Sequence, residues 1–297
     1  MVRRLPILFT LFLAAACARK VPGVKIDPAM AMLIPRDATV LGGVHVEALQ
    51  KTSIYKKYLA DRQIPAADDL AKLTGIDARK DLWELVFVAG EKYSAVLGRG
   101  SFASDMEPKL ERAGARIVPY KAYHLIGNDQ TSIVFFSSST AAVGTPDALR
   151  WIVDARGTGG GPPTPLAEMM KQLPEEAQIW AVESGAPALP RGLSGNLGNA
   201  NKLLSSIQSG ALHFDLRTGL SGVASGACAT EKDAQDVGGA LKALVGFARL
   251  STPADQPELA KIYDGVRVTQ EARQVKLYID VPEPLVEKLA NMIPAVK

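Results

Sequence analysis

A short proline-to-strand phrase occurs twice in this sequence, and the repetition constrains the fold more than any other feature. The first copy runs from Ile34 to Leu41 and the second from Leu173 to Trp180, so their starts lie 139 residues apart. A second pairing without gaps sets Tyr120–Phe136 against Tyr263–Ile279, at an offset of 143 residues. Both of these stretches alternate around a polar turn, which is typical of a β-hairpin. Two landmarks in the same order predict a tandem duplication.

Between the landmarks each half follows the same order, a pair of strands and then a helix. In the first half the predicted strands are Leu82–Ala89 and Tyr93–Gly98, and the predicted helices are Ser101–Ala113, ended by Gly114, and Asp147–Arg156. In the second half the strands are Ala211–Leu216 and Gly219–Ala224, and the helices are Glu231–Phe247 and Pro284–Ile293. Each half is therefore expected to be an antiparallel sheet with helices packed on one face, an α+β plan.

A glycine- and proline-rich stretch separates the two halves. Residues 157–163 read Gly-Thr-Gly-Gly-Gly-Pro-Pro, which predicts a flexible segment closed by stiff prolines. The domain boundaries that follow are 1–16 for a leader, 17–31 for a tether, 32–156 for the first half, 157–165 for the linker and 166–297 for the second half.

The amino terminus has the order of an export signal. Arg3 and Arg4 form a positive region, an apolar run extends from Leu5 to Ala16, and small residues precede Cys17. As a helix, these 12 residues would be about 18 Å long, shorter than the roughly 30 Å hydrocarbon core of a bilayer. The run therefore predicts a cleaved leader, of either a lipoprotein or a plainly secreted protein.

The stretch from Leu13 to Cys17 resembles the lipobox of bacterial lipoproteins, in which small residues precede a cysteine that is acylated and becomes the first residue. The resemblance departs from the preferred pattern at Ala14, where the family favours a larger aliphatic residue. It implies a lipid on Cys17 as the membrane anchor and a place in the cell envelope. Ala18 follows that cysteine in place of the aspartate that retains lipoproteins at the inner membrane, which implies the outer membrane, facing the periplasm, in a Gram-negative host.

The phrase from Leu73 to Leu82, taken with the repeated proline-to-strand phrase, loosely resembles duplicated envelope proteins of bacteria. The resemblance covers most of the body. It implies the architecture and carries no activity, so no catalytic or ligand-binding residue can be transferred from it.

Composition limits the classes of partner. Without Arg3 and Arg4 the chain has 32 basic and 31 acidic residues, spread along its length, and aromatic residues make up 6%. Nucleic-acid binding would need a basic stripe interleaved with aromatic residues, so we expect none. With Cys17 lipidated only Cys228 remains, so no intramolecular disulfide is expected, and the small apolar neighbours of Cys228 predict a buried, inert thiol.

No pattern in the body indicates catalysis, a cofactor or a metal. His45, His124 and His213 each lie between residues of the opposite strand face and lack zinc-ligand spacing. Ser194 and Ser221 lack the last glycine of a Gly-x-Ser-x-Gly turn. We therefore expect no catalytic residue, no cofactor-binding residue and no metal ligand, and one lipidation site, Cys17.

One long loop, residues 184–201, has no counterpart in the first half and is either a flap over a partner or ligand or a plain insertion. The resulting hypothesis is a membrane-anchored, non-catalytic binding or assembly module for an envelope protein. The alternatives are a carrier or sensor of an apolar ligand bound between the halves, and an enzyme of unrecognised type. A large apolar cavity beneath the loop would favour the carrier.

Overall fold

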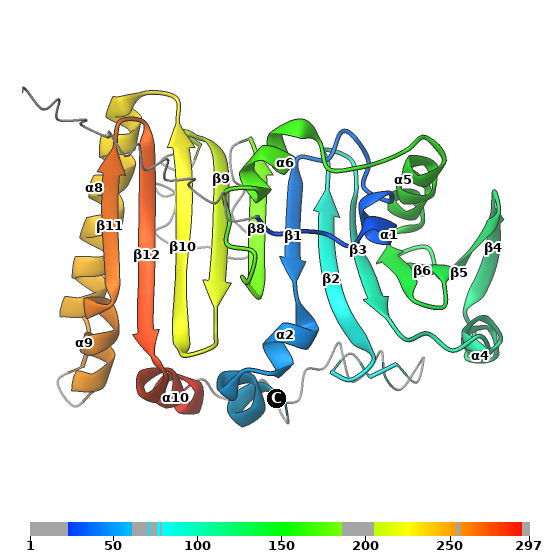
Figure 1. The fold of residues 1–297 in the computed structure, drawn as a ribbon, viewed down its shortest axis with the longest axis horizontal. Helices are drawn as coiled ribbons and strands as arrows, with labels where there is room; N and C mark the ends of the chain where they lie inside the picture. Colours follow the sequence, from blue (N-terminus) through cyan, green and yellow to red (C-terminus); the bar gives the residue numbers. More distant parts are fainter. Residues whose placement is uncertain are drawn as a thin grey trace, which may run out of the picture.

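The computed structural model describes residues 23–60, 71, 76–77, 79–185, 205–253 and 256–292. The predicted leader, Cys17 and all but the first two residues of the 184–201 loop lie outside these residues. A 12-stranded sheet runs through the molecule in the order β11-β12-β10-β9-β8-β1-β2-β3-β7-β6-β5-β4 (Figure 1). All of its strand pairs are antiparallel. The chain is an α+β protein, as the sequence predicts.

The strands and helices have the following bounds. The strands are β1 Val40–Val44, β2 Leu82–Ala89, β3 Ser94–Gly100, β4 Arg116–Tyr120, β5 Tyr123–Gly127, β6 Ser132–Ser137, β7 Thr140–Gly144, β8 Ile179–Ser184, β9 Ile207–Asp215, β10 Gly219–Cys228, β11 Val266–Glu271 and β12 Gln274–Pro282. The helices are α1 Pro28–Ala31, α2 Val46–Gln50, the π-helix η1 Tyr55–Leu59, α4 Met106–Arg112, α5 Pro146–Gly157, α6 Thr164–Met170, α8 Glu231–Leu250, α9 Pro257–Asp264 and α10 Glu283–Met292.

The two halves meet at the centre of the sheet. The repeated proline-to-strand phrase leads into β1 in the first half and β8 in the second, and these strands pair antiparallel, with Gly42 opposite Ala181. Strands β1 to β7 extend to one side and β8 to β12 to the other, so both halves share a single continuous sheet.

The strand order matches the two halves differently from the gap-free sequence pairing, and the difference is one hairpin. Strand β12 lies beside β10 as β7 lies beside β3, so the β11–β12 hairpin corresponds in position to β6–β7. The gap-free sequence pairing instead matched β11–β12 with β5–β6, because short alternating strands resemble one another in any register. The hairpins themselves are present, and β4 and β5 have no positional counterpart among the described strands of the second half. The duplication stays a prediction.

Alternation divides the sheet into two faces, which we call face A and face B. Face A bears Leu41, Val86 and Trp180 at the centre, and face B bears the neighbouring residues Gly42 and Phe87. On face A the helices α1 and α5 cover the first half and α6 covers β8, and their common core includes Leu149, Ile152 and Leu166, all fully buried. On face B the first half carries α4, through Met106 and Leu110. Helices therefore occupy both faces of the first half.

In the second half α8 packs on face B, with Val237 against Val275. A capping box starts this helix, since Thr230 accepts a hydrogen bond from the Asp233 amide and the Asp233 side chain accepts one from the Thr230 amide. Helices α2, η1 and α10 close the end of the same face around Leu49, Leu216 and Val286. Figure 1 shows α8 alongside β11 at one end of the sheet and α5 towards the other.

The predicted linker and tether are both more firmly held than the sequence suggests. The amide of Gly161 donates to the Ile34 carbonyl (2.9 Å) and the Arg36 guanidinium to the Gly159 carbonyl (3.0 Å), so this segment is docked on the first half. In the predicted tether, Val24 and Met30 are buried in the face A core and Asp27 pairs with Arg99. Packing of these apolar side chains therefore fixes the described part of the predicted tether against the first half.

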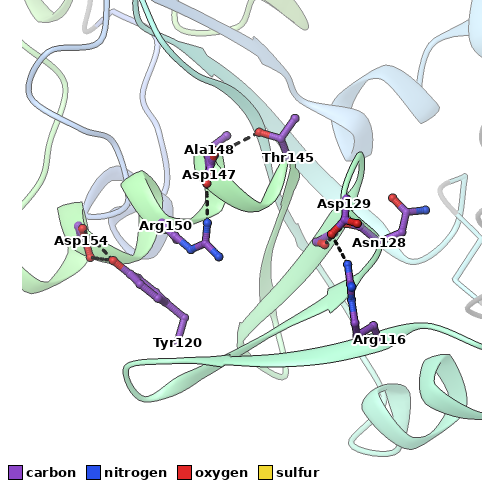
Figure 2. A network of polar contacts seen from close by, with 10 residues as sticks. Arg116, Tyr120, Asn128, Asp129, Thr145, Asp147, Ala148, Arg150 and Asp154 are labelled. Atoms are coloured by element: carbon purple, nitrogen blue, oxygen red, sulfur yellow. Dashed lines mark hydrogen bonds and ion pairs between the residues drawn. The ribbon is translucent and has the colours of Figure 1, made fainter.

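Polar contacts fasten the edge of the first half that is far from the centre. Figure 2 shows the Tyr120 hydroxyl donating to the Asp154 carboxylate of α5 (3.1 Å), and Arg116 of β4 paired with Asp129. Helix α5 begins with Thr145, whose hydroxyl accepts a hydrogen bond from the Ala148 amide. The Tyr120–Asp154 bond holds the β4–β5 hairpin against α5, and the Arg116–Asp129 pair ties β4 to the turn between β5 and β6.

Candidate functional site

A strongly apolar hollow lies on face B of the second half. It has a volume of about 340 Å³ and is open to solvent. Its floor is formed by strands β8, β9, β10 and β12, and its wall by α8. The lining residues are Ala181, Val182, Glu183, Ile207, Gly210, Ala211, Leu212, Ala224, Ser225, Gly226, Val237, Leu241, Val275 and Leu277. We call this hollow the apolar trough.

Small residues on the floor create the trough. Ala181, Gly210, Ala224 and Gly226 occupy face B positions where larger side chains would fill the space below α8. A Cβ added at Gly210 would meet only the Ser225 carbonyl, at 3.7 Å, so the space above this glycine is open. The trough therefore results from missing side-chain volume and not from a gap in the sheet.

Face B remains apolar and partly exposed beyond the trough. Moving towards the first half, the strands present Gly42, Phe87 and Val96 on this face. Phe87 is 42% exposed and Val96 is 37% exposed. On the directly opposite face Leu41, Val86 and Leu97 are fully buried. Phe87 and Val96 therefore extend the apolar surface of face B beyond the trough.

Glu183 is the charged residue of the trough. It is the second-last residue of β8, and its backbone lies opposite Val40 on one side and Gly210 on the other. No described residue forms an ion pair or hydrogen bond with its carboxylate. Burial alone raises the pKa of Glu183 above its ordinary value.

A second, polar hollow of about 390 Å³ lies at the other end of the central strands. Arg99 of β3 lies over the Trp83 ring, with its Cζ 5.5 Å from the ring centroid, and pairs with Asp27. The Nδ1 atom of His45 is 4.0 Å from Oε1 of Glu84. The lining residues are His45, Glu47, Ala48, Lys51, Trp83, Glu84, Arg99, Glu175 and Glu176.

Glu84 has the most perturbed carboxyl group among those described. Its side chain is 12% exposed, and its Oε1 has no hydrogen-bond partner. Burial, assisted by the negative charge of Asp27 and opposed by Arg99, raises the pKa of Glu84 to about 7. Burial also lowers the pKa of His45 below its ordinary value. This hollow gathers acids and a histidine from both halves, but no serine, threonine or cysteine lines it as a nucleophile.

The structure places the residues singled out in the sequence apart from one another. Cys228 is 2% exposed in the face B core, and burial raises the pKa of its thiol, which confirms a buried thiol. His213 lies on face A, opposite to Leu212 on face B, and burial lowers its pKa. His124 pairs with Glu107 at 2.9 Å, and His45 occupies the N-cap position of α2 without a side-chain capping hydrogen bond.

Ser221 lies within β10, as predicted, and Ser194 lies outside the described residues. Within the described ranges no three His, Cys, Asp or Glu side chains come together in a way that could hold a metal ion. The same residues include no helix with the length and hydrophobicity needed to cross a bilayer.

The sequence patterns did not single out Glu84 or Glu183, the glutamates of the two hollows. Glu84 lies on the same face of β2 as Val86 and Val88, because alternate residues of a strand share a face. A charged residue among these inward apolar positions is the sequence feature that could have identified it. Glu183 has the parity of Ala181, but only the strand order reveals that this parity leads into the trough.

The comparisons with known proteins bear only on the fold. No protein-family model matches the sequence, and no curated protein matches it. Among solved structures, crystal form III of TP0453 has a TM-score of 0.52 and 9% identity, over 90% of this chain and 99% of that chain. Crystal form I of TP0453 has a TM-score of 0.49 and 11% identity, over 91% and 97%. At these identities the likeness to form III supports a shared fold and nothing about activity.

Proposed function

We propose that this chain is an exported lipoprotein, anchored by lipid on Cys17, and that its folded body binds an apolar ligand in the trough on face B. The observation that carries the proposal is the trough itself, an apolar hollow of about 340 Å³. Small-molecule sites are typically concave and apolar with few polar groups, and this hollow lies within the usual size range.

The position of the trough favours a carrier and refines that hypothesis. All of the lining residues, from Ala181 to Leu277, belong to the second half, so the ligand would lie within one half and not between the two. The trough reaches Glu183 and Ile207, close to the two ends of the segment 186–204. No serine, threonine or cysteine lines the polar hollow around Glu84, which gives an enzyme with a hydroxyl or thiol nucleophile there less support.

The anchor would keep the body close to the membrane. Gly23 packs closely on the folded body, because a Cβ added there would lie 2.3 Å from the Met170 carbonyl oxygen. From Cys17 to Gly23 a fully extended chain can span only about 20 Å. Lasting attachment requires more than one acyl chain, as in the lipoproteins that the leader resembles.

The ligand-binding claim is tested by filling the trough. In Gly210→Val the new side chain would extend into the open space, and valine suits a strand. Gly42→Val is the matched control, a glycine on the same face whose added Cβ would meet atoms at 3.4 Å or more but which does not line the trough. We expect Gly210→Val to weaken binding of the neutral fluorophore N-phenyl-1-naphthylamine at least tenfold, roughly 1.4 kcal/mol, and Gly42→Val to leave it within about twofold.

Equal binding by both variants, with thermal unfolding midpoints showing both to be folded, would contradict an apolar site in the trough. The non-catalytic assembly module would then be the better hypothesis.

The anchoring claim has its own test. The full chain is expressed in a bacterial host with Cys17 intact and as Cys17→Ser, and the membranes are fractionated. We expect the intact protein in the membrane fraction with an acylated cysteine in its mass spectrum, and the variant in the soluble fraction with its fold unchanged. Retention of both in the membrane, or an uncleaved leader, would contradict lipid anchoring.

A further inference from the structure

The charge distribution in the trough restricts which apolar ligands it can hold, and this restriction rests on the proposed function. Of the 14 lining residues Glu183 alone is charged. The only other polar side chain is Ser225, whose hydroxyl already donates to the Ala211 carbonyl at 3.3 Å. A ligand lying in the trough would therefore meet one ionisable group, a carboxylate at the end of β8.

Glu183 has no counterion among the described residues. Two other partly buried acids are paired with arginines: Asp215 with Arg217, and Asp27 with Arg99. For Glu183, burial is the single cause of its raised pKa, and no neighbouring charge contributes. A half-buried carboxylate without a partner is unfavourable, and covering it with an uncharged or anionic ligand would make it more so.

A ligand with a positive head group would remove this cost. A protonated amine placed at Glu183 would form a charge-assisted hydrogen bond with this half-buried carboxylate. Its hydrocarbon chain would lie over Ala181, Leu212 and Ala224, on the side of α8 that carries Leu241. A fatty acid would instead bring a second carboxylate towards Glu183, and like charges at short range repel.

We propose that the trough is a site for cationic amphiphiles, molecules in which a single hydrocarbon chain carries an amine head group, and that Glu183 is the residue that selects the head group. Charge complementarity assigns this ligand class: an apolar floor for the chain and one unpaired carboxylate for the amine.

The test compares three probes that share a twelve-carbon chain: dodecylamine, dodecanol and dodecanoate. Each displaces N-phenyl-1-naphthylamine from the full-length protein at pH 7, below micelle-forming concentrations. We expect the amine to bind about tenfold more tightly than the alcohol and the carboxylate to bind most weakly, because one favourable ion pair in a partly desolvated site is worth about one decade in affinity.

Glu183→Gln should bring the amine and alcohol to within about threefold of each other and should improve binding of dodecanoate. Glu91→Gln is the matched control, because it makes the same charge change at an exposed turn between β2 and β3 and should alter none of the three affinities. Gly210→Val should weaken all three probes together.

The outcomes separate the two proposals. If the alcohol binds and Gly210→Val blocks it, but the wild-type protein shows no preference for the amine or prefers dodecanoate, the head-group inference is overturned and the ligand site stands. The same conclusion follows if Glu183→Gln and Glu91→Gln weaken the amine equally. If none of the three probes binds, the apolar site itself fails.

Discussion

At the centre of the sheet, face A and face B are built from the same strands but are covered differently. Under α1, α5 and α6 the central residues Leu41, Val86 and Trp180 are completely or almost completely buried. On face B the strands present glycine and alanine, and Phe87 remains 42% exposed. A sheet that buries its large side chains on one face can therefore leave apolar surface exposed on the other.

Two adjacent glycines give the strongest test of this comparison. A Cβ at Gly43, on face A, would lie 2.3 Å from atoms of the Trp180 indole, whereas a Cβ at Gly42, on face B, would meet nothing closer than 3.4 Å. We expect Gly43→Ala to lower the free energy of unfolding by about 3 kcal/mol through overpacking. Gly42→Ala should change it by less than about 1 kcal/mol. Urea denaturation measures both, and a similar loss in the two variants would contradict the assignment of the faces.

The next effect is a dependence of stability on pH that arises from Glu84. Its folded-state pKa of about 7 is above its ordinary value of 4.5, so the folded state binds more protons and its advantage is lost as pH rises through 7. Between pH 5 and pH 8 the wild-type protein should lose roughly 2 to 3 kcal/mol relative to Glu84→Gln.

His45 acts in the opposite direction in part of this range. Its lowered pKa disfavours the folded state as pH falls below about 6.5, so His45→Gln is measured alongside as a control. Parallel pH profiles for the wild-type protein and Glu84→Gln would show that this carboxyl ionises normally.

The smallest effect concerns local opening of the two cores. Cys228 belongs to a small core under α8, made by Ile207, Ala234, Val237 and Val275, and Ala142 belongs to the much larger face A core. In a Cys17→Ser background we expect a thiol reagent to label Cys228 about tenfold faster than a cysteine at position 142 in Ala142→Cys/Cys228→Ala. Rates are normalised to those of the unfolded chains, and slower labelling of Cys228 would reverse the comparison.

Local sequence patterns determined the elements well. Leu82–Ala89 is β2 with the predicted bounds, the helix predicted at Glu231–Phe247 is α8, and Gly114 ends α4 with a positive φ of 93°. These features depend on alternation, capping and backbone freedom within a few residues, so the chain encodes them locally.

The prediction of a cleaved leader and of lipid on Cys17 also comes from the sequence, because an export signal is read from the order of residues and not from a fold. Tertiary structure alone decided where distant strands meet. The pairing of β1 with β8 joins the halves into one sheet, and it turns Gly42 and Ala181 to the same open face. The position of Glu183 in the trough and the burial of Glu84 beside Asp27 follow from that pairing and from strand order, since both depend on residues far apart in the chain.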